Sequence, residues 1–215
     1  MYAFVTGGYF DKDTDYSFYK NMILNARYKI AADSGMRVFK KLEIVPDFLI
    51  GDMDSVEIDD MKWAEENGCV IYLYKMDKDY LDTELAAFLA RMIGCDSLMI
   101  CGVWGGRPDQ SIASLNFINL CEENDVTAEI INERYRMGKI SSPKRREFIT
   151  KKGNVWSFTS LSGTCRGINY KGLEYPLINA ELASYEAKGL SNVACDDKIE
   201  VEISEGELFY FELYS

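Results

Sequence analysis

The feature that most constrains the fold is a change of hydrophobic pattern near residue 140. Before that point, short apolar runs alternate with segments of helical periodicity, which is typical of βαβ units and a mainly parallel sheet. After it, short strands alternate with turn residues, which predicts a small all-β sandwich or barrel. We therefore expect a Rossmann-like α/β domain over residues 1–140 and a small all-β domain, taken as a sandwich, over residues 147–215.

The individual elements follow from the same periodicities. The clearest helix is expected over residues 82–93, where Leu85, Leu89 and Met92 recur at helical spacing and Gly94 stands where a C-terminal glycine belongs. Further helices are expected over Ser17–Asn25, Met36–Lys41, Ile58–Asn67 and Asp109–Glu123. Strands are expected over Tyr2–Thr6, Tyr28–Ala32, Phe48–Ile50, Val70–Tyr74, Ser97–Cys101, Thr127–Asn132, Val155–Leu161, Gly167–Tyr170, Ala183–Tyr185, Glu200–Ser204 and Glu207–Leu213. The basic run at residues 144–146 is read as a solvated loop between the domains, with a phosphate or nucleic-acid contact as the alternative.

Glycine and aspartate recur directly after the expected strands of the first domain, where open α/β sheets bind their ligands. Each loop alone has an ordinary structural explanation. Asp82 and Asp109 would cap helices, Gly105-Gly106 would form a tight turn, and Asp33 would form an Asx-turn. If the fold is right, however, the carboxylates at the strand ends converge on one rim of the sheet. These carboxylates are Asp33, Asp52, Asp54, Asp79, Asp82 and Asp109.

The composition narrows the chemistry that this rim can perform. The chain has 35 acidic and 24 basic residues and no histidine, which excludes Ser–His and Cys–His dyads and histidine metal ligands. Converging carboxylates repel one another unless they are protonated or hold a cation, and an oxygen-only site favours a hard ion such as Mg²⁺. Arg107 stands among these loops and would clamp a phosphoryl group. The residues thus predict a Mg²⁺-dependent nucleotide or phosphoryl-transfer site.

Other classes of protein fit the sequence poorly. The net charge of −11 argues against nucleic acid or an anionic membrane as a partner. The six cysteines are scattered without a CxxC pair, and no apolar run is long enough to span a membrane. We expect a cytoplasmic protein with reduced thiols.

The same loops resemble those of the thiamine pyrophosphokinase family in their order. The segments AADSG, PDFLIGDMDS, KDYLDTELA and GGRPDQSIASLN are followed by SGTCRGINYKGLEYPL and GLSN, so that the resemblance covers almost the whole chain. The family's fold is an α/β nucleotide-binding domain followed by a β-sandwich, and its members form homodimers with thiamine bound between the domains of two subunits. Membership implies transfer of a pyrophosphoryl group from the co-substrate ATP to the hydroxyl of thiamine, which gives thiamine diphosphate and AMP.

The resemblance also assigns roles to residues. Asp52, Asp54 and Asp82 would hold Mg²⁺, and Asp82 or Asp54 would accept the proton of the thiamine hydroxyl. Arg107 would bind the phosphates. The ATP-binding set would further include Asp33, Gly35, Gly105, Gly106 and Asp109, and the thiamine-binding set Gln110, Ser191 and Asn192.

Two other functions compete with this one. A strand that ends in GDMDS also resembles the loop of haloacid-dehalogenase-type phosphatases, which would use Asp52 as a nucleophile. The other alternative is a sensor of thiamine or nucleotide that keeps the fold without catalysis.

Overall fold

The structure of the chain is a computed structural model, and it describes residues 2–74 and 81–215. The chain divides into two compact units, Met1–Glu133 and Arg134–Ser215. The two-unit organisation expected from the sequence is therefore confirmed. The division lies before the expected boundary at residue 140, because β7 (Tyr135–Ser141) pairs along its whole length with β14 (Glu207–Leu213).

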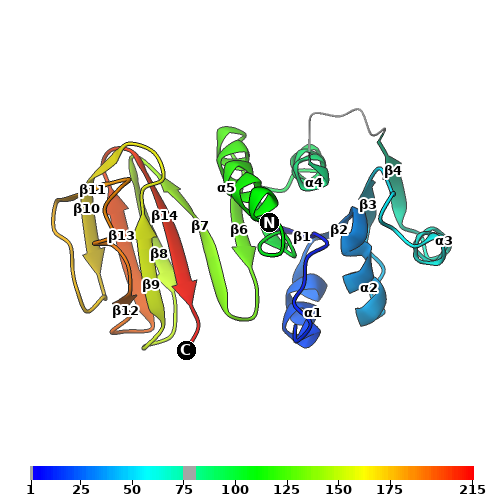
Figure 1. The fold of residues 1–215 in the computed structure, drawn as a ribbon, viewed down its shortest axis with the longest axis horizontal. Helices are drawn as coiled ribbons and strands as arrows, with labels where there is room; N and C mark the ends of the chain where they lie inside the picture. The colour runs from blue at the N-terminus through cyan, green and yellow to red at the C-terminus, as the bar shows by residue number, and fades with distance from the viewer. Residues whose placement is uncertain (1, 75–80) are drawn as a thin grey trace. The chain divides into compact units, whose positions relative to one another are not determined.

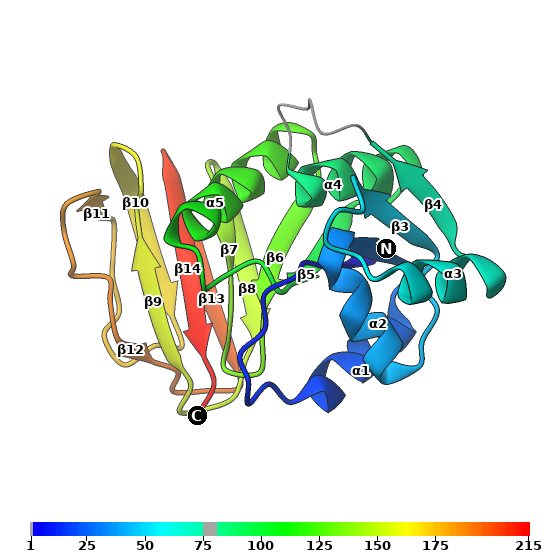
Figure 2. The ribbon, with the colours of Figure 1, turned by 45° about the vertical axis from the view of Figure 1, so that its right-hand side comes forward.

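The first unit is built on parallel strands in the order β4-β3-β2-β1-β5-β6. The strands are β1 (Tyr2–Thr6), β2 (Tyr28–Ala32), β3 (Phe48–Gly51), β4 (Val70–Leu73), β5 (Ser97–Cys101) and β6 (Thr127–Ile131). Between them lie α1 (Tyr16–Asn25), the 3₁₀ turn η1 (Asp33–Gly35), α2 (Met36–Leu42), α3 (Ile58–Glu66), α4 (Asp82–Met92) and α5 (Pro108–Glu123). Figure 1 and Figure 2 draw α1 and α2 on one side of the strands and α4 and α5 on the other.

The sequence explains why β1 lies in the middle of this sheet. Ala3, Phe4 and Val5 are completely buried, as expected for a parallel strand that is covered on both faces. The strand order runs from β1 through β2 and β3 to β4 and then reverses, since β5 pairs with the other side of β1. Such a reversal leaves a crevice beyond the carboxyl ends of the two strands that flank it, here β1 and β5.

Helix α4 shows how local sequence signals position the rim of the sheet. Leu85 and Leu89 are buried on the inner face of the helix. At the N-terminus, the backbone N–H of Leu81 donates to the Glu84 carboxylate at 2.8 Å. At the C-terminus, Gly94 has a φ of 84° and ends the helix in the left-handed conformation, as its sequence position predicted. Among the helices in the described residues, none is long and apolar enough to cross a membrane.

The second unit is formed by antiparallel strands in two sets. In addition to β7 and β14, the strands are β8 (Lys144–Ile149), β9 (Val155–Thr159), β10 (Thr164–Lys171), β11 (Ala180–Ala183), β12 (Asn192–Val193) and β13 (Lys198–Ile203). One set runs β12-β9-β14-β7 and the other β11-β10-β13-β8. Both sets contribute to one core, in which Phe148, Trp156, Phe158 and Tyr210 pack with ring centroids 4.7–6.1 Å apart.

Two sequence expectations for this unit were wrong. The basic run at residues 144–146 is part of strand β8 and not a loop, because each of its residues pairs with a residue of β13. Arg145 forms an ion pair with Glu200, and Arg146 lies over the ring of Phe148. The strand expected over residues 183–185 instead ends at Ala183, since the chain turns there.

Candidate active site

A pocket of about 400 Å³ lies in the first unit, among the loops that follow β1, β2 and β5 and the first turns of α4 and α5. This is the crevice that the reversal of strand order leaves. The residues that line it are Gly7, Gly8, Tyr9, Ala32, Asp33, Ser34, Leu81, Asp82, Thr83, Gly102, Val103, Gly105, Gly106, Arg107, Gln110 and Ser114.

The floor of the pocket depends on a close approach between two backbone segments. The N–H of Gly7 donates to the carbonyl of Cys101 at 2.7 Å, and that of Tyr9 donates to the carbonyl of Gly102 at 2.8 Å. A Cβ on Gly7 would lie 2.5 Å from the Gly102 carbonyl oxygen, so no larger residue fits there. Backbone that approaches this closely offers a ligand a wall without side chains.

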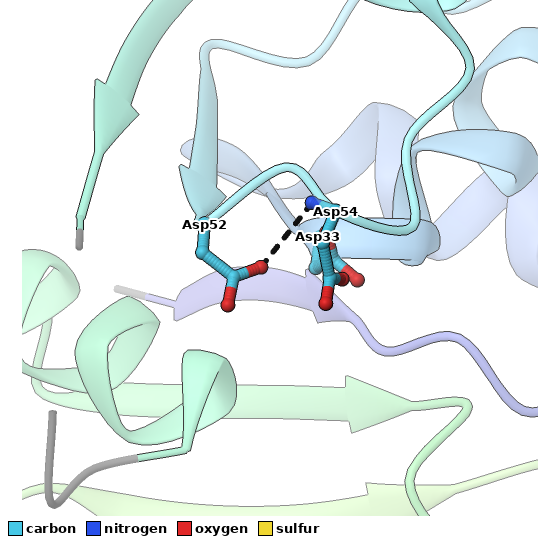
Figure 3. A group of neighbouring side chains, drawn as sticks. All are labelled: Asp33, Asp52 and Asp54. Atoms are coloured by element: carbon cyan, nitrogen blue, oxygen red, sulfur yellow. Dashed lines mark hydrogen bonds between the residues drawn. The ribbon is translucent and has the colours of Figure 1, made fainter. Parts of the chain in front are cut away.

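Three carboxylates gather beside this pocket, at the ends of β2 and β3 (Figure 3). Asp33, Asp52 and Asp54 each bring one oxygen within 4.8 Å of the other two. The loop that carries the last two is held locally, because the Asp54 N–H donates to Oδ1 of Asp52 at 3.3 Å and the Ser55 hydroxyl donates to Oδ1 of Asp54 at 2.8 Å. Asp33 also lines the pocket, so the cluster and the pocket share a side chain.

The electrostatics of Asp33 reflect its burial and the negative charges around it. Its pKa is raised, first by burial and then by the negative charges of Asp82, Asp54 and Asp52, while the backbone of Ser34 acts in the opposite direction. Oδ1 of Asp33 is buried and has no hydrogen-bond partner among the residues that the structure describes. A buried carboxylate oxygen in a group of carboxylates is costly unless one of them is protonated or the group holds a cation. The donor set is purely carboxylate, which fits Mg²⁺ and other hard divalent ions.

Asp82 lies near this cluster but is not among the three residues that form it. As the first residue of α4 it lines the pocket, and its charge contributes to the raised pKa of Asp33. The sequence grouped Asp82 with Asp52 and Asp54, whereas the described structure brings Asp33 closest to those two. The helix-capping explanation was wrong for both aspartates, because the residues at the cap positions are Leu81 and Arg107. Residues 77–79, which include Asp79, lie outside the described residues.

Arg107 immediately precedes α5 and forms an ion pair with Asp109. Its Nε and terminal nitrogen donate to the two carboxylate oxygens at 3.2 and 2.6 Å. This contact lowers the pKa of Asp109 and raises that of Arg107. Both side chains are about two-thirds exposed, at 68 % and 65 %, so the pair is screened by water and is readily exchanged for a stronger anion. Arg107 lines the pocket, whereas Asp109, which bonds to Arg107, is not among the described residues that line it.

The predicted glycine residues take different positions. Gly105 and Gly106 line the pocket and have φ values of 112° and 68°. Gly35 is buried instead, and a Cβ there would lie 2.0 Å from the carbonyl oxygen of Thr6. The Thr6 hydroxyl also donates to the Gly35 carbonyl at 3.0 Å. Gly35 thus packs η1 against β1, and its neighbour Ser34 faces the pocket.

The predicted thiamine residues fall in both units. Gln110 lines the pocket of the first unit. In the second unit, Ser191 has a φ of 59°, and its N–H donates to the Ser157 hydroxyl at 3.1 Å. The side chain of Asn192 is buried, accepts from the N–H groups of Tyr175 and Val193, and donates to the Tyr175 carbonyl at 2.7 Å. Most of its hydrogen-bonding capacity therefore holds the Tyr175 segment.

Aromatic residues near the C-terminus differ in burial. Phe209 and Tyr210 are buried in the second unit, so packing is their role. Tyr175 is 63 % exposed and remains available to a ligand.

Several pocket residues were not found from the sequence. They are Tyr9, Thr83, Val103 and Ser114, which flank the glycine and aspartate motifs. Spacing would have found Ser114, because it stands one helical turn after Gln110, and its hydroxyl donates to the Gln110 carbonyl at 2.9 Å. Tyr9 follows the Gly7-Gly8 pair directly.

Comparison with known proteins identifies both units. Residues 19–130 match the family model "Thiamin pyrophosphokinase, catalytic domain", and residues 139–208 match "Thiamin pyrophosphokinase, vitamin B1 binding domain". The chain is 24 % identical over 165 residues to the thiamine pyrophosphokinase of Bacillus subtilis (strain 168), which covers 76 % of each protein.

Solved structures show the same fold. The crystal structure of thiamine pyrophosphokinase from Bacillus subtilis is similar with a TM-score of 0.87 at 17 % identity, covering 100 % of both chains. The structure of the enzyme from Geobacillus thermodenitrificans has a TM-score of 0.83 at 18 % identity, covering 100 % of this chain and 98 % of that one. The structure of the enzyme from Candida albicans has a TM-score of 0.82 at 16 % identity, covering 99 % of this chain and 90 % of that one. Since the catalytic-domain model alone spans more than half of the sequence, the chain belongs to the thiamin pyrophosphokinase family of enzymes.

Proposed function

We propose that this chain transfers a pyrophosphoryl group from ATP to the hydroxyl of thiamine and releases thiamine diphosphate and AMP, with Mg²⁺ as the metal. The main support for the proposal is the position of Asp33, which belongs both to a carboxylate cluster and to a glycine-lined pocket. The cluster and most of the residues that line the pocket lie within residues 19–130, which match the catalytic-domain model, while Gly7, Gly8 and Tyr9 precede that segment. A polyphosphate bound with a divalent cation needs this combination, because the cation and the backbone together neutralise and seat its charges.

The acidic cluster is the proposed metal site. Asp52, Asp54 and Asp33 would hold Mg²⁺, with Asp82 at the edge of the same group. When bound, Mg²⁺ supplies positive charge that orients the triphosphate and stabilises the leaving AMP. Oδ1 of Asp33 supports this assignment, since it is buried without a hydrogen-bond partner among residues 2–74 and 81–215, and a bound cation would compensate it.

Arg107 is the proposed phosphate-binding residue. Its guanidinium is held by an exposed carboxylate that a phosphate can replace, and the fork geometry of arginine suits bidentate binding of phosphate. Gly105 and Gly106 let the backbone approach the nucleotide, and Asp109 positions Arg107 when ATP is absent. Gly35 acts indirectly, by packing the turn that carries Asp33.

In the proposed reaction, the hydroxyl oxygen of thiamine forms a bond to the β-phosphorus while the bond from that phosphorus to the α,β-bridging oxygen breaks. The bridging oxygen leaves with AMP. The hydroxyl proton passes to a carboxylate, for which Asp82 and Asp54 are the candidates because they border the pocket and the cluster. In-line positioning of the two substrates supplies much of the acceleration.

We propose that Gln110, Ser191 and Asn192 seat thiamine, with Asn192 acting through the Tyr175 segment that it holds. Consistent with the family resemblance, we further propose a homodimer. The parallel order of the first unit supports a Rossmann-like domain, and the shared core of the two antiparallel sets supports a β-sandwich.

A product analysis tests the reaction. Purified protein is incubated with ATP, thiamine and Mg²⁺, and the nucleotides are separated. We expect one AMP for each thiamine diphosphate, no AMP without thiamine, and no turnover with EDTA. Formation of ADP would mean ordinary phosphoryl transfer. A trapped acyl phosphate on Asp52 would favour a phosphatase mechanism. Binding of thiamine or ATP without turnover would indicate a sensor.

A further inference from the structure

The turn that carries Arg107 has little rigidity of its own. Gly105 and Gly106 both adopt positive φ values, which suit glycine, and neither has a side chain that would fix the turn. Glycine also loses more conformational freedom on ordering than any other residue. The position of the Arg107 guanidinium therefore depends on contacts that other residues make with this turn.

Tyr9 supplies one set of contacts. Its ring lies against both glycines, because a Cβ on Gly105 would be 2.3 Å from one ring edge and a Cβ on Gly106 would be 2.4 Å from the other. The base of the residue is fixed by the hydrogen bond from its N–H to the Gly102 carbonyl at 2.8 Å. The tip is fixed by the bond from its hydroxyl to Oδ1 of Asp11, also 2.8 Å long.

The electrostatics of Tyr9 are consistent with this placement. The hydrogen bond to Asp11 is the main cause of the raised pKa of Tyr9, and the backbone of Gly106 acts in the opposite direction. Both Asp11 and the backbone of the turn therefore affect the pKa of the Tyr9 hydroxyl.

Ser111 supplies the second set of contacts. Its hydroxyl accepts from the Gly105 N–H at 2.9 Å and donates to the Arg107 carbonyl at 3.2 Å. One buried hydroxyl, in a residue only 8 % exposed, therefore joins the two ends of the turn. Removing it would leave the Gly105 N–H without this acceptor inside a partly closed site.

We propose that Tyr9 and Ser111 are positioning residues that hold the Gly105–Arg107 turn, Tyr9 by packing its ring on the glycines and Ser111 by bridging the turn with its hydroxyl. Together they fix the direction in which Arg107 presents its guanidinium to the phosphates of ATP. The inference rests on the proposed function, because it takes the phosphates of ATP as the ligand of Arg107. It adds two residues that act through Arg107, one from the loop after β1 and one from the first turn of α5.

The test compares Tyr9→Ala and Ser111→Ala with the wild type, in binding of Mg·ATP by titration calorimetry and in steady-state kinetics. We expect each variant to raise the dissociation constant and the KM for ATP about three- to tenfold, the range that loss of one ordering contact produces, with the KM for thiamine within about twofold of wild type. Tyr9→Phe keeps the ring and should stay within about twofold of wild type for ATP, since only the bond to Asp11 is lost. Ser17→Ala is the matched control, because its hydroxyl also donates a hydrogen bond but bonds to Asp15, away from the pocket.

A double-mutant cycle separates positioning from a general loss of structure. In an Arg107→Ala background, the same substitutions should change ATP affinity by less than about twofold, because the group that they position is gone. Full effects in that background, or unchanged ATP affinity of Tyr9→Ala and Ser111→Ala, would overturn the proposal. Thermal unfolding reports whether each variant folds, and if one does not, the other carries the test.

Failure of the proposed function gives a different result. If the wild type binds Mg·ATP but forms no AMP with thiamine, the reaction is wrong, while the binding series still tests the positioning role. If the wild type turns over normally and the variants match it, the reaction stands and the positioning role is wrong.

Discussion

Replacing Asp33 by asparagine tests the electrostatic account of the metal cluster. Asparagine keeps the shape of the side chain and removes its charge. Asp33 has an oxygen within 4.8 Å of oxygens of both Asp52 and Asp54. At this separation each repulsion costs about 1 kcal/mol in water and about 3 kcal/mol at an effective dielectric constant of 20. Asp54 is exposed, so the lower figure applies, and two pairs give about 1–2 kcal/mol.

The expected result in metal-free buffer is therefore a stabilised protein. For a chain of this length, about 1–2 kcal/mol corresponds to a rise of about 2–8 °C in the unfolding midpoint of the first unit. The substitution should also weaken the additional stabilisation that Mg²⁺ gives the wild type, because a ligand that binds the folded state stabilises it in proportion to its affinity. Turnover should fall strongly. Asp13→Asn removes an exposed charge outside the pocket and should change none of these quantities.

The pH dependence has a defined sign. The pKa of Asp33 is raised in the folded state above its ordinary value of 3.8. The contribution of Asp33 to stability is therefore fully present below that pH and is lost as the pH rises through the raised pKa. Differential scanning calorimetry of the metal-free protein between pH 4 and pH 8 measures this loss of stability as Asp33 ionises. In Asp33→Asn the loss should be absent. If metal-free Asp33→Asn melts at a lower temperature than the wild type and Mg²⁺ raises both melting temperatures equally, the carboxylates neither repel one another nor bind the metal through Asp33.

Three further outcomes are expected. Asp54→Asn should lower turnover by orders of magnitude and leave the circular dichroism spectrum unchanged, because a ligand charge is lost from a partly exposed loop; near-normal activity would contradict the metal assignment. Leu89→Ala should lower the free energy of unfolding in urea by about 2–4 kcal/mol, since Leu89 is buried on α4. It should also lower activity by disturbing Asp82 at the start of that helix. A loss of stability below about 0.5 kcal/mol would contradict the packing of Leu89. A thiol reagent at pH 8 should label only Cys195 in the native protein, because it is the exposed cysteine, while burial raises the pKa of Cys69 to about 12; labelling that persists in Cys195→Ser would contradict this.

The sequence predicted the first unit well because its signals are local. Parallel strands such as β1 and β5 are apolar runs bounded by glycine, and both were placed at their observed bounds. The second unit was harder, because its strands are short and carry charges whose partners lie far along the chain. β8 was read as a loop, since the pairing of Arg145 with Glu200 across the sheet is a tertiary contact that no local pattern contains.

The site follows the same division. The sequence grouped the aspartates at the strand ends, because the carboxyl ends of parallel strands meet at one edge. It could not tell which of them come closest. Asp33 joins Asp52 and Asp54 through the backbone geometry of two loops, since Asp33 has a φ of 46° after β2 and Met53 a φ of 65° after β3. Tyr9 was missed for a similar reason, since its contact with the glycine turn after β5 joins distant parts of the chain.

An isotope experiment shows which phosphorus of ATP the hydroxyl of thiamine attacks. ATP labelled at the β-phosphorus is incubated with the protein, Mg²⁺ and thiamine, and the label is followed into the separated products. For attack on the β-phosphorus, we expect all transferred label in thiamine diphosphate and none in AMP, with one AMP formed for each thiamine diphosphate. Label that remains in a nucleoside diphosphate, with thiamine monophosphate as the product, would show attack on the γ-phosphorus and contradict the account.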